Sequence, residues 1–216
     1  MNVRRSEGRV FVISGPSGGG KTTVVQQLRR KLPRLLRSVS VTTRRPRRGE
    51  RHGRDYQFIS LPTFRRLRRT RQLLEWARVH EAYYGTPRRP IERALAAGRR
   101  VVLSIDVQGA RQIRRALRTQ SILIFLLPPS MRRLRQRLIR RKTETPDAIR
   151  QRLTAAQREL ACAAWYDHTV VNDRLDQTVA ALEAIIRETG RSATRSSSAG
   201  TASRRVPVTQ AGQHRG

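Results

Sequence analysis

Cysteine, lysine and acidic residues are all scarce in this chain. The single cysteine, Cys162, permits no internal disulfide, so the composition favours a reducing compartment and a cytoplasmic location. The longest apolar run, residues 122–127, has the size of a strand and falls far short of the roughly 18 residues that a membrane span needs. We therefore expect no membrane association.

The scarcity of acids leaves a large excess of positive charge. The chain holds 47 basic residues, all but three of them arginine, against 15 acids, for a net charge of +32. Such a balance suggests nucleic-acid binding. The arginines, however, are spread over every expected helix and form no single stripe interleaved with aromatic residues. We expect weak, non-specific binding of polyanions at low salt and no specific nucleic-acid partner.

The most informative motif lies near the N-terminus. Residues 10–13 predict a buried strand, and residues 15–22 then fit G-x-x-x-x-G-K-[ST] before an amphipathic segment begins. This is the P-loop pattern, in which glycines let backbone N–H groups converge on phosphate and the next helix adds its positive end. Lys21 can reach the β- and γ-phosphates, and the Thr22 hydroxyl can ligate Mg²⁺. The expected phosphate-binding residues are Gly15, Pro16, Ser17, Gly18, Gly19, Gly20, Lys21, Thr22 and Thr23.

Strand-like and helical segments alternate along most of the chain, which predicts an α/β fold with a parallel sheet. The expected strands are 10–13, 101–105, 122–127 and 169–171. The expected helices are 22–31, 62–70, 90–97, 110–117, 130–141, 146–164 and 176–188. Short β-like pieces at 38–43, 56–59 and 73–79 indicate an inserted subdomain. Low-complexity composition after residue 190 predicts a disordered basic tail, 191–216.

A second phosphate site is indicated within the insertion. Arg44 and Arg47 flank the proline-stiffened turn at Pro46, and paired guanidinium groups suit a phosphate dianion. Further motifs follow in order: Gly49-Glu50, Asp55-Tyr56, Glu75-Trp76-Ala77, Tyr83-Tyr84-Gly85-Thr86, Ile105-Asp106, Pro128-Pro129-Ser130 and Val171-Asn172-Asp173. With these motifs, residues 10–188 closely resemble the guanylate kinase family, whose members transfer the γ-phosphoryl of ATP to GMP.

The resemblance implies a P-loop NTPase-type, three-layer α/β core with a parallel sheet, an inserted mixed α/β GMP-binding subdomain and a small lid. Within a domain of residues 1–190, it places the core at 8–37 and 89–190, the insertion at 38–88 and the lid at about 139–152. It implies Mg²⁺ as cofactor, ATP and GMP as substrates, a role in purine nucleotide metabolism and GMP recycling, and a monomer or small homo-oligomer.

The family's functional residues can be carried over one by one. The resemblance assigns the GMP phosphate to Arg44, Arg47, Tyr56 and Tyr84. It assigns guanine to Ser40, Glu75, Thr86 and Asp106. Catalysis falls to Lys21 with Arg137, Arg141 and Arg152, while Asn172 lies near the adenine of ATP. Thr22 would hold the metal, with Asp106 able to assist through a bound water.

The sequence departs from the family pattern at three places, one of which is Arg174, where the family usually has a second acid after Asn172-Asp173. Ser104 stands where the family usually has the first acid of Asp-x-Asp, and Arg140 and Lys142 replace the glycines that usually flank the lid arginine. The sequence also bears on three other functions. An intact P-loop argues against a non-catalytic phosphopeptide-binding module. The guanine-binding set argues against a kinase for a phosphorylated ribose, and the dispersed charge argues against a nucleic-acid-binding protein.

Overall fold

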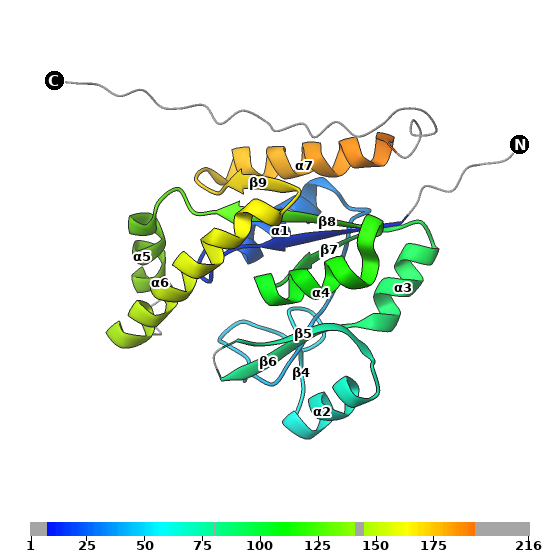
Figure 1. The fold of residues 1–216 in the computed structure, drawn as a ribbon, viewed down its shortest axis with the longest axis horizontal. Coiled ribbons are helices and arrows are strands. Elements are labelled where there is room, and N and C mark those ends of the chain that lie inside the picture. The colour runs from blue at the N-terminus through cyan, green and yellow to red at the C-terminus, as the bar shows by residue number, and fades with distance from the viewer. Residues whose placement is uncertain (1–7, 80, 141–144, 193–216) are drawn as a thin grey trace, which may run out of the picture.

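The computed structural model describes residues 8–79, 81–140 and 145–192, which form two sheets and the helices around them (Figure 1). The larger sheet has five parallel strands in the order β2-β7-β1-β8-β9. The smaller sheet is mixed, in the order β4-β3-β6-β5. The strands are β1 Arg9–Ser14, β2 Leu36–Arg37, β3 Val41–Thr42, β4 Gln57–Phe58, β5 Leu73–Val79, β6 Ala82–Pro87, β7 Arg100–Ser104, β8 Ser121–Leu127 and β9 His168–Val171.

Local sequence signals begin several of the helices. Ser60 and Thr145 cap the helices that follow them, each with a proline in the first turn, and Asp106 caps another. The helices are α1 Lys21–Lys31, α2 Leu61–Arg69, α3 Arg88–Ala96, α4 Val107–Leu117, α5 Met131–Arg140, α6 Pro146–Leu160 and α7 Leu175–Ser192. Short 3₁₀ helices occupy Arg118–Gln120 and Ala161–Trp165. Within the described part of the chain, no helix is long and apolar enough to cross a membrane.

Helices cover both faces of the parallel sheet. Alternate residues of β1 point to opposite faces, so Phe11 and Ile13 join α1 and α7 in one apolar cluster. Val10 and Val12 join α3 and α4 in a second cluster on the other face. The central strands are therefore apolar at nearly every position, as buried parallel strands usually are. The predicted three-layer α/β core is confirmed.

The smaller sheet has its own apolar cluster and a defined attachment to the core. Phe64 of α2 packs against Val41 and Leu73 of the sheet. The side-chain amide of Gln112, on α4, donates to the Trp76 carbonyl (2.6 Å) and accepts from the Trp76 N–H (3.2 Å). This pair of bonds fixes β5 to the helix that covers one face of the core.

Helices α5 and α6 form an antiparallel pair beside the P-loop. Leu134, Leu138 and Ala156 are buried between them. Leu138 also lies against the loop, because a Cβ built on Gly18 would come within 2.7 Å of its Cδ2. The pair thus packs directly on the segment that the sequence assigns to phosphate binding.

The predicted elements match the structure except for short strands and for the ends of some elements. Strands β2 and β6 were not predicted. The expected strand 38–43 shrinks to β3, and the expected helix 146–164 tightens into a 3₁₀ turn after Leu160. Helix α7 continues through Ser192, past the expected start of the tail, and residues 193–216 lie outside the described residues.

Candidate active site

The P-loop lies between β1 and α1, as predicted, at the carboxyl end of the central strand. The Lys21 ammonium folds back over the loop, where its Nζ donates to the carbonyl oxygens of Gly15 (2.5 Å) and Pro16 (3.1 Å). Thr22 and Thr23 are exposed at the start of α1. Both the positive end of the helix and the lysine therefore lie at the same loop.

Glycine is required at position 20 for two reasons. Gly20 has φ +87°, a left-handed conformation that costs other L-residues roughly 1–2 kcal/mol. A Cβ built there would also lie 2.7 Å from Nδ2 of Asn172. That amide donates to the Gly19 carbonyl at 2.6 Å, so the closeness reflects a specific contact. The structure thus brings the predicted Asn172 onto the P-loop from a segment about 150 residues away.

Two of the predicted catalytic arginines also reach this region. Arg137 of α5 donates from Nη2 to the Asn172 carbonyl (2.9 Å), and Arg152 of α6 donates from Nη1 to the Ser17 hydroxyl (2.7 Å). Arg141 lies outside the described residues. Two guanidinium groups and one ammonium therefore surround a loop built to bind anions.

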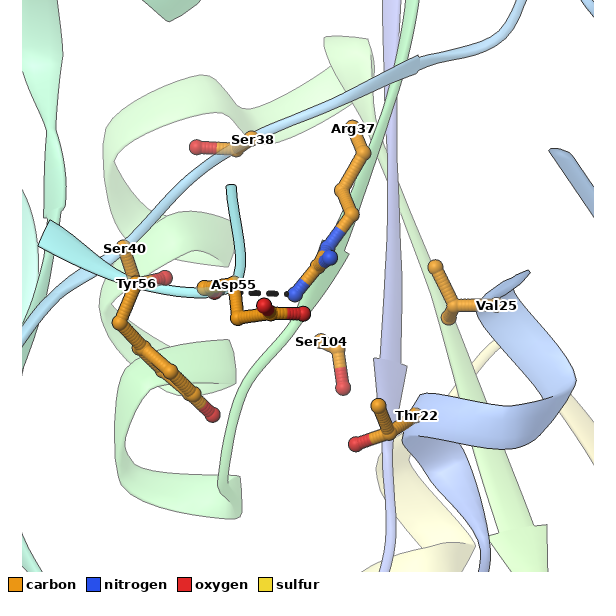
Figure 2. Close-up of a pocket in the computed structure, with 8 residues that line it drawn as sticks. All are labelled: Thr22, Val25, Arg37, Ser38, Ser40, Asp55, Tyr56 and Ser104. Atoms are coloured by element: carbon orange, nitrogen blue, oxygen red, sulfur yellow. Dashed lines mark hydrogen bonds between the residues drawn. The ribbon is translucent and has the colours of Figure 1, made fainter. Parts of the chain in front are cut away.

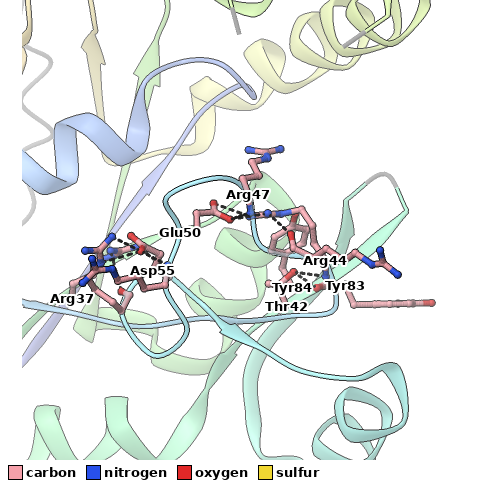
Figure 3. A network of polar contacts seen from close by, with 11 residues as sticks. Arg37, Thr42, Arg44, Arg47, Glu50, Asp55, Tyr83 and Tyr84 are labelled. Atoms are coloured by element: carbon pink, nitrogen blue, oxygen red, sulfur yellow. Dashed lines mark hydrogen bonds and ion pairs between the residues drawn. The ribbon is translucent and has the colours of Figure 1, made fainter. Parts of the chain in front are cut away.

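Three of the predicted GMP-phosphate residues, Arg44, Arg47 and Tyr84, lie together beside the smaller sheet (Figure 3). Arg44 forms two 2.9 Å bonds to the Glu50 carboxylate, donates from Nε to the Tyr84 hydroxyl at 3.1 Å and lies over the Tyr56 ring. The Arg47 N–H donates to the same carboxylate at 2.7 Å, while its side chain is exposed and extends away from the pair. Glu50 thus organises both arginines. The sequence identifies the Gly49-Glu50 motif but does not predict this role for Glu50.

The predicted guanine residues include a buried carboxylate. Glu75 is 3% exposed, and its Oε1 accepts a 2.6 Å hydrogen bond from the Thr86 hydroxyl. Burial raises the pKa of Glu75 to about 8, a rise that the Thr86 hydrogen bond opposes and the nearby Asp106 reinforces. The other oxygen lies close to Gly109, where a built Cβ would approach it within 2.5 Å. Glu75 and Thr86 are adjacent partners across β5 and β6.

Asp106 interacts electrostatically with Glu75 of the second sheet and with Lys21 of the P-loop. Its Oδ1 accepts from the Gly109 N–H (2.8 Å), which begins α4 beside Glu75. Burial raises its pKa, while the Gly109 hydrogen bond and the charge of Lys21 oppose the rise. Glu159 of α6 has its pKa raised by burial too, and it interacts electrostatically with Lys21 and Asp106. Glu159 was missed, although it lies seven residues after Arg152 and therefore on the same helix face.

A small cleft lies between the two predicted sites and is lined by residues from both sides (Figure 2). Thr22 and Ser104 line it from the core, and Ser40 and Tyr56 line it from the side of the smaller sheet. Arg37 and Asp55 complete the wall between them. Residues predicted for the metal and for GMP therefore border a single space, although nearly 20 residues or more separate them in sequence.

These features define a class of protein. A parallel α/β sheet, a P-loop at the end of its central strand and arginines converging on that loop are characteristic of P-loop nucleotide-binding phosphotransferases. The additional sheet, with its arginine pair and buried carboxylate, supplies a second polar site across the cleft.

Comparison with known proteins defines the family. The family model described as guanylate kinase matches residues 7–189. The chain is 46% identical over 183 residues to a guanylate kinase of Dechloromonas aromatica, covering 85% of this chain and 90% of that one. It is 48% identical over 182 residues to a guanylate kinase of Oleidesulfovibrio alaskensis, covering 84% and 88%. The crystal structure of guanylate kinase from Anaplasma phagocytophilum superposes with a TM-score of 0.74 at 33% identity, covering 86% and 88%. The chain belongs to the guanylate kinase family.

Proposed function

We propose that this protein is an ATP-dependent guanylate kinase, which transfers the γ-phosphoryl of ATP to GMP and yields ADP and GDP. The structural observation that supports the proposal is the placement of the P-loop beside the acceptor segment, because Thr22 on one side and Ser40 and Tyr56 on the other border the same small cleft. Phosphoryl transfer requires two phosphates held in line with their charge neutralised, and it needs no side-chain nucleophile. Such an activity would serve GMP recycling in the cytoplasm.

On the donor side, the chain's cations would bind and orient ATP. The P-loop amides would hold the phosphates, and Lys21 would exchange its contacts with Gly15 and Pro16 for phosphate oxygens. Arg137 and Arg152 already contact the segments that flank the loop. They would neutralise the charge that develops on the transferred group. Asn172 would pack near adenine, and the end of α5 with the first half of α6 would belong to the lid proposed at 139–152.

The donor groups around Thr22 fit Mg²⁺ that arrives with the nucleotide. Among the described residues, no group of three or more His, Cys, Asp or Glu side chains could hold an ion by itself. Magnesium usually takes only one or two protein ligands, completing its shell with water and substrate phosphates. Here Thr22 would be the direct ligand, with Asp106 assisting through a water. When bound, the ion neutralises charge on the β- and γ-phosphates.

On the acceptor side, residues 38–88 would bind GMP as an insertion between the core segments 8–37 and 89–190. Two nitrogens of the Arg44 guanidinium are already bonded to the Glu50 carboxylate. The phosphate would therefore be contacted by the exposed Arg47 guanidinium and by the hydroxyls of Tyr56 and Tyr84. Arg44 would add charge and hold Tyr84 in place. Glu75, with Thr86, would accept hydrogen bonds from the N1–H and amino groups of guanine, a pairing that adenine cannot make.

A coupled assay of ADP formation tests the proposal. Purified protein should phosphorylate GMP in the presence of ATP and Mg²⁺ and should turn over AMP, CMP and UMP far more slowly. A Lys21→Met variant should lose most of the activity, because it removes the ammonium group from the P-loop, and its melting curve should show that it remains folded. Equal activity on AMP and GMP would refute the assignment of substrate.

A further inference from the structure

The position of Arg37 in the fold is unusual. It is the last residue of β2, the edge strand of the core sheet, where it pairs with Val102 of β7. The chain then leaves the core for the smaller sheet. Yet the Arg37 side chain turns toward that second region and forms part of the cleft wall (Figure 2).

Arg37 bonds to the backbone of a loop some 17 residues further along the chain. Its Nη2 donates to the Asp55 carbonyl (3.0 Å), and its Nη1 donates to the Arg54 carbonyl (3.4 Å). A planar guanidinium can span two successive carbonyl groups, whereas an ammonium offers a single point of attachment. The core is thereby joined to the loop through two charge-assisted hydrogen bonds.

The loop that Arg37 binds is internally braced. The Asp55 carboxylate accepts hydrogen bonds from the Arg51 N–H (2.9 Å) and from Arg54 Nε (3.0 Å). The Gly53 N–H donates to the Tyr56 carbonyl at 2.8 Å. A contact at Asp55 is therefore transmitted to Tyr56, which follows it directly.

The two sides of the smaller sheet are thus attached to the core by different means. On one side, Gln112 of α4 holds β5 through Trp76. On the other side, Arg37 holds the segment that carries Tyr56, next to the two-residue strand β4. The N–H groups of Gln57 and Ile59 hold this segment to its neighbouring strand, each with a 2.9 Å bond to a carbonyl group. The Arg37 contact adds a direct bond from the segment to the core.

From this arrangement we infer that Arg37 is a positioning residue for the acceptor nucleotide. It binds the Arg54 and Asp55 carbonyl groups and so holds Tyr56 at a fixed place across the cleft from Thr22. The inference rests on the proposed function, because it assumes that Tyr56 contacts the GMP phosphate. It concerns the acceptor alone, since the donor contacts of the P-loop involve other elements.

Steady-state kinetics and calorimetry of two variants test this role. Arg37→Ala and Arg37→Lys should each raise KM and Kd for GMP about tenfold, the equivalent of losing one charge-assisted bond. KM for ATP should stay unchanged, and melting curves should show that both variants remain folded at the assay temperature. Arg34→Ala is the matched control, because it removes one exposed positive charge from the same segment and should leave every value unaltered. A Lys variant equal to wild type would overturn the inference, since charge alone would then suffice.

A double-mutant cycle separates positioning from general support of the fold. If Arg37 acts through Tyr56, Arg37→Ala should have little further effect on Kd for GMP in a Tyr56→Phe background. Additive effects, or a parallel rise in KM for ATP, would overturn the inference. If the wild-type protein binds ATP but neither binds nor phosphorylates GMP, the proposed function itself fails. If the wild type is active and the Arg37 variants match it, only the inference about Arg37 fails.

Discussion

The buried carboxylate of Glu75 should make GMP recognition depend on pH. With a pKa of about 8, Glu75 is mostly protonated at pH 7 in the absence of nucleotide. Guanine presents two donors, which bind the ionised form best. GMP binding should therefore release a proton, and the affinity should rise as the pH approaches 8 and then level off.

The size of the effect follows from the pKa. One pH unit below the pKa, ionisation costs about 1.4 kcal/mol, or about tenfold in affinity. Between pH 7.0 and 8.5, kcat/KM for GMP should thus rise roughly eightfold. The GMP phosphate stays predominantly dianionic in this range, because its second pKa is about 6. The assay is the coupled ADP measurement at saturating ATP over these pH values.

Glu75→Gln is the matched variant, because it keeps the shape and removes the titration. One end of the amide is a donor that faces the donors of guanine, so kcat/KM for GMP should fall by at least 2 kcal/mol, or about 30-fold, at pH 8.5. At pH 7.0 the deficit should narrow to about fourfold, since the wild type then pays for ionisation. KM for ATP should change little.

Two results would refute this reasoning. The first is a Gln variant that keeps the pH slope of the wild type, which would place the titrating group elsewhere. The second is a fall in melting temperature with the preference for GMP over AMP intact, which would make Glu75 a structural residue. Stability gives an independent check. Because the folded pKa lies above the unfolded one, the free protein should lose stability as the pH rises from about 4.5 to 8, and the Gln variant should lose less.

Three further predictions concern the metal, the loop and the tail. Ser104→Asp should lower the Mg²⁺ concentration that gives half-maximal rate, because it adds a carboxylate to the cleft that Thr22 lines. An unchanged Mg²⁺ response would show that residue 104 does not interact with the ion. Gly20→Ala should raise KM for ATP at least tenfold and lower the melting temperature, because the backbone at residue 20 is left-handed and Asn172 crowds the added methyl group. Wild-type values of both quantities would contradict this loop geometry. Deletion of 193–216 should leave activity on GMP nearly unchanged and weaken adsorption to RNA at low salt, as filter binding would measure; a large fall in kcat would assign the tail a part in the enzyme.

The sequence alone determined the core of this protein. The apolar strands β1, β7 and β8 and the amphipathic helices between them carry periodicities that are local and strong, so their existence and order were predictable. The P-loop was equally readable, because its chemistry requires particular residues at fixed spacing. The family resemblance then names most residues of the candidate site from their motifs alone.

Only the tertiary structure decided how distant polar groups pair. β2 and β6 have too little local pattern to be predicted, and they exist because neighbouring strands offer them hydrogen-bonding partners. Glu50 becomes the partner of Arg44, and Glu75 acquires its pKa from burial between β5 and α4. The contact of Arg37 with Asp55 likewise depends on two segments meeting in space. Sequence fixes which groups a chain carries, but desolvation and distance, which set their energies, arise only when the chain folds.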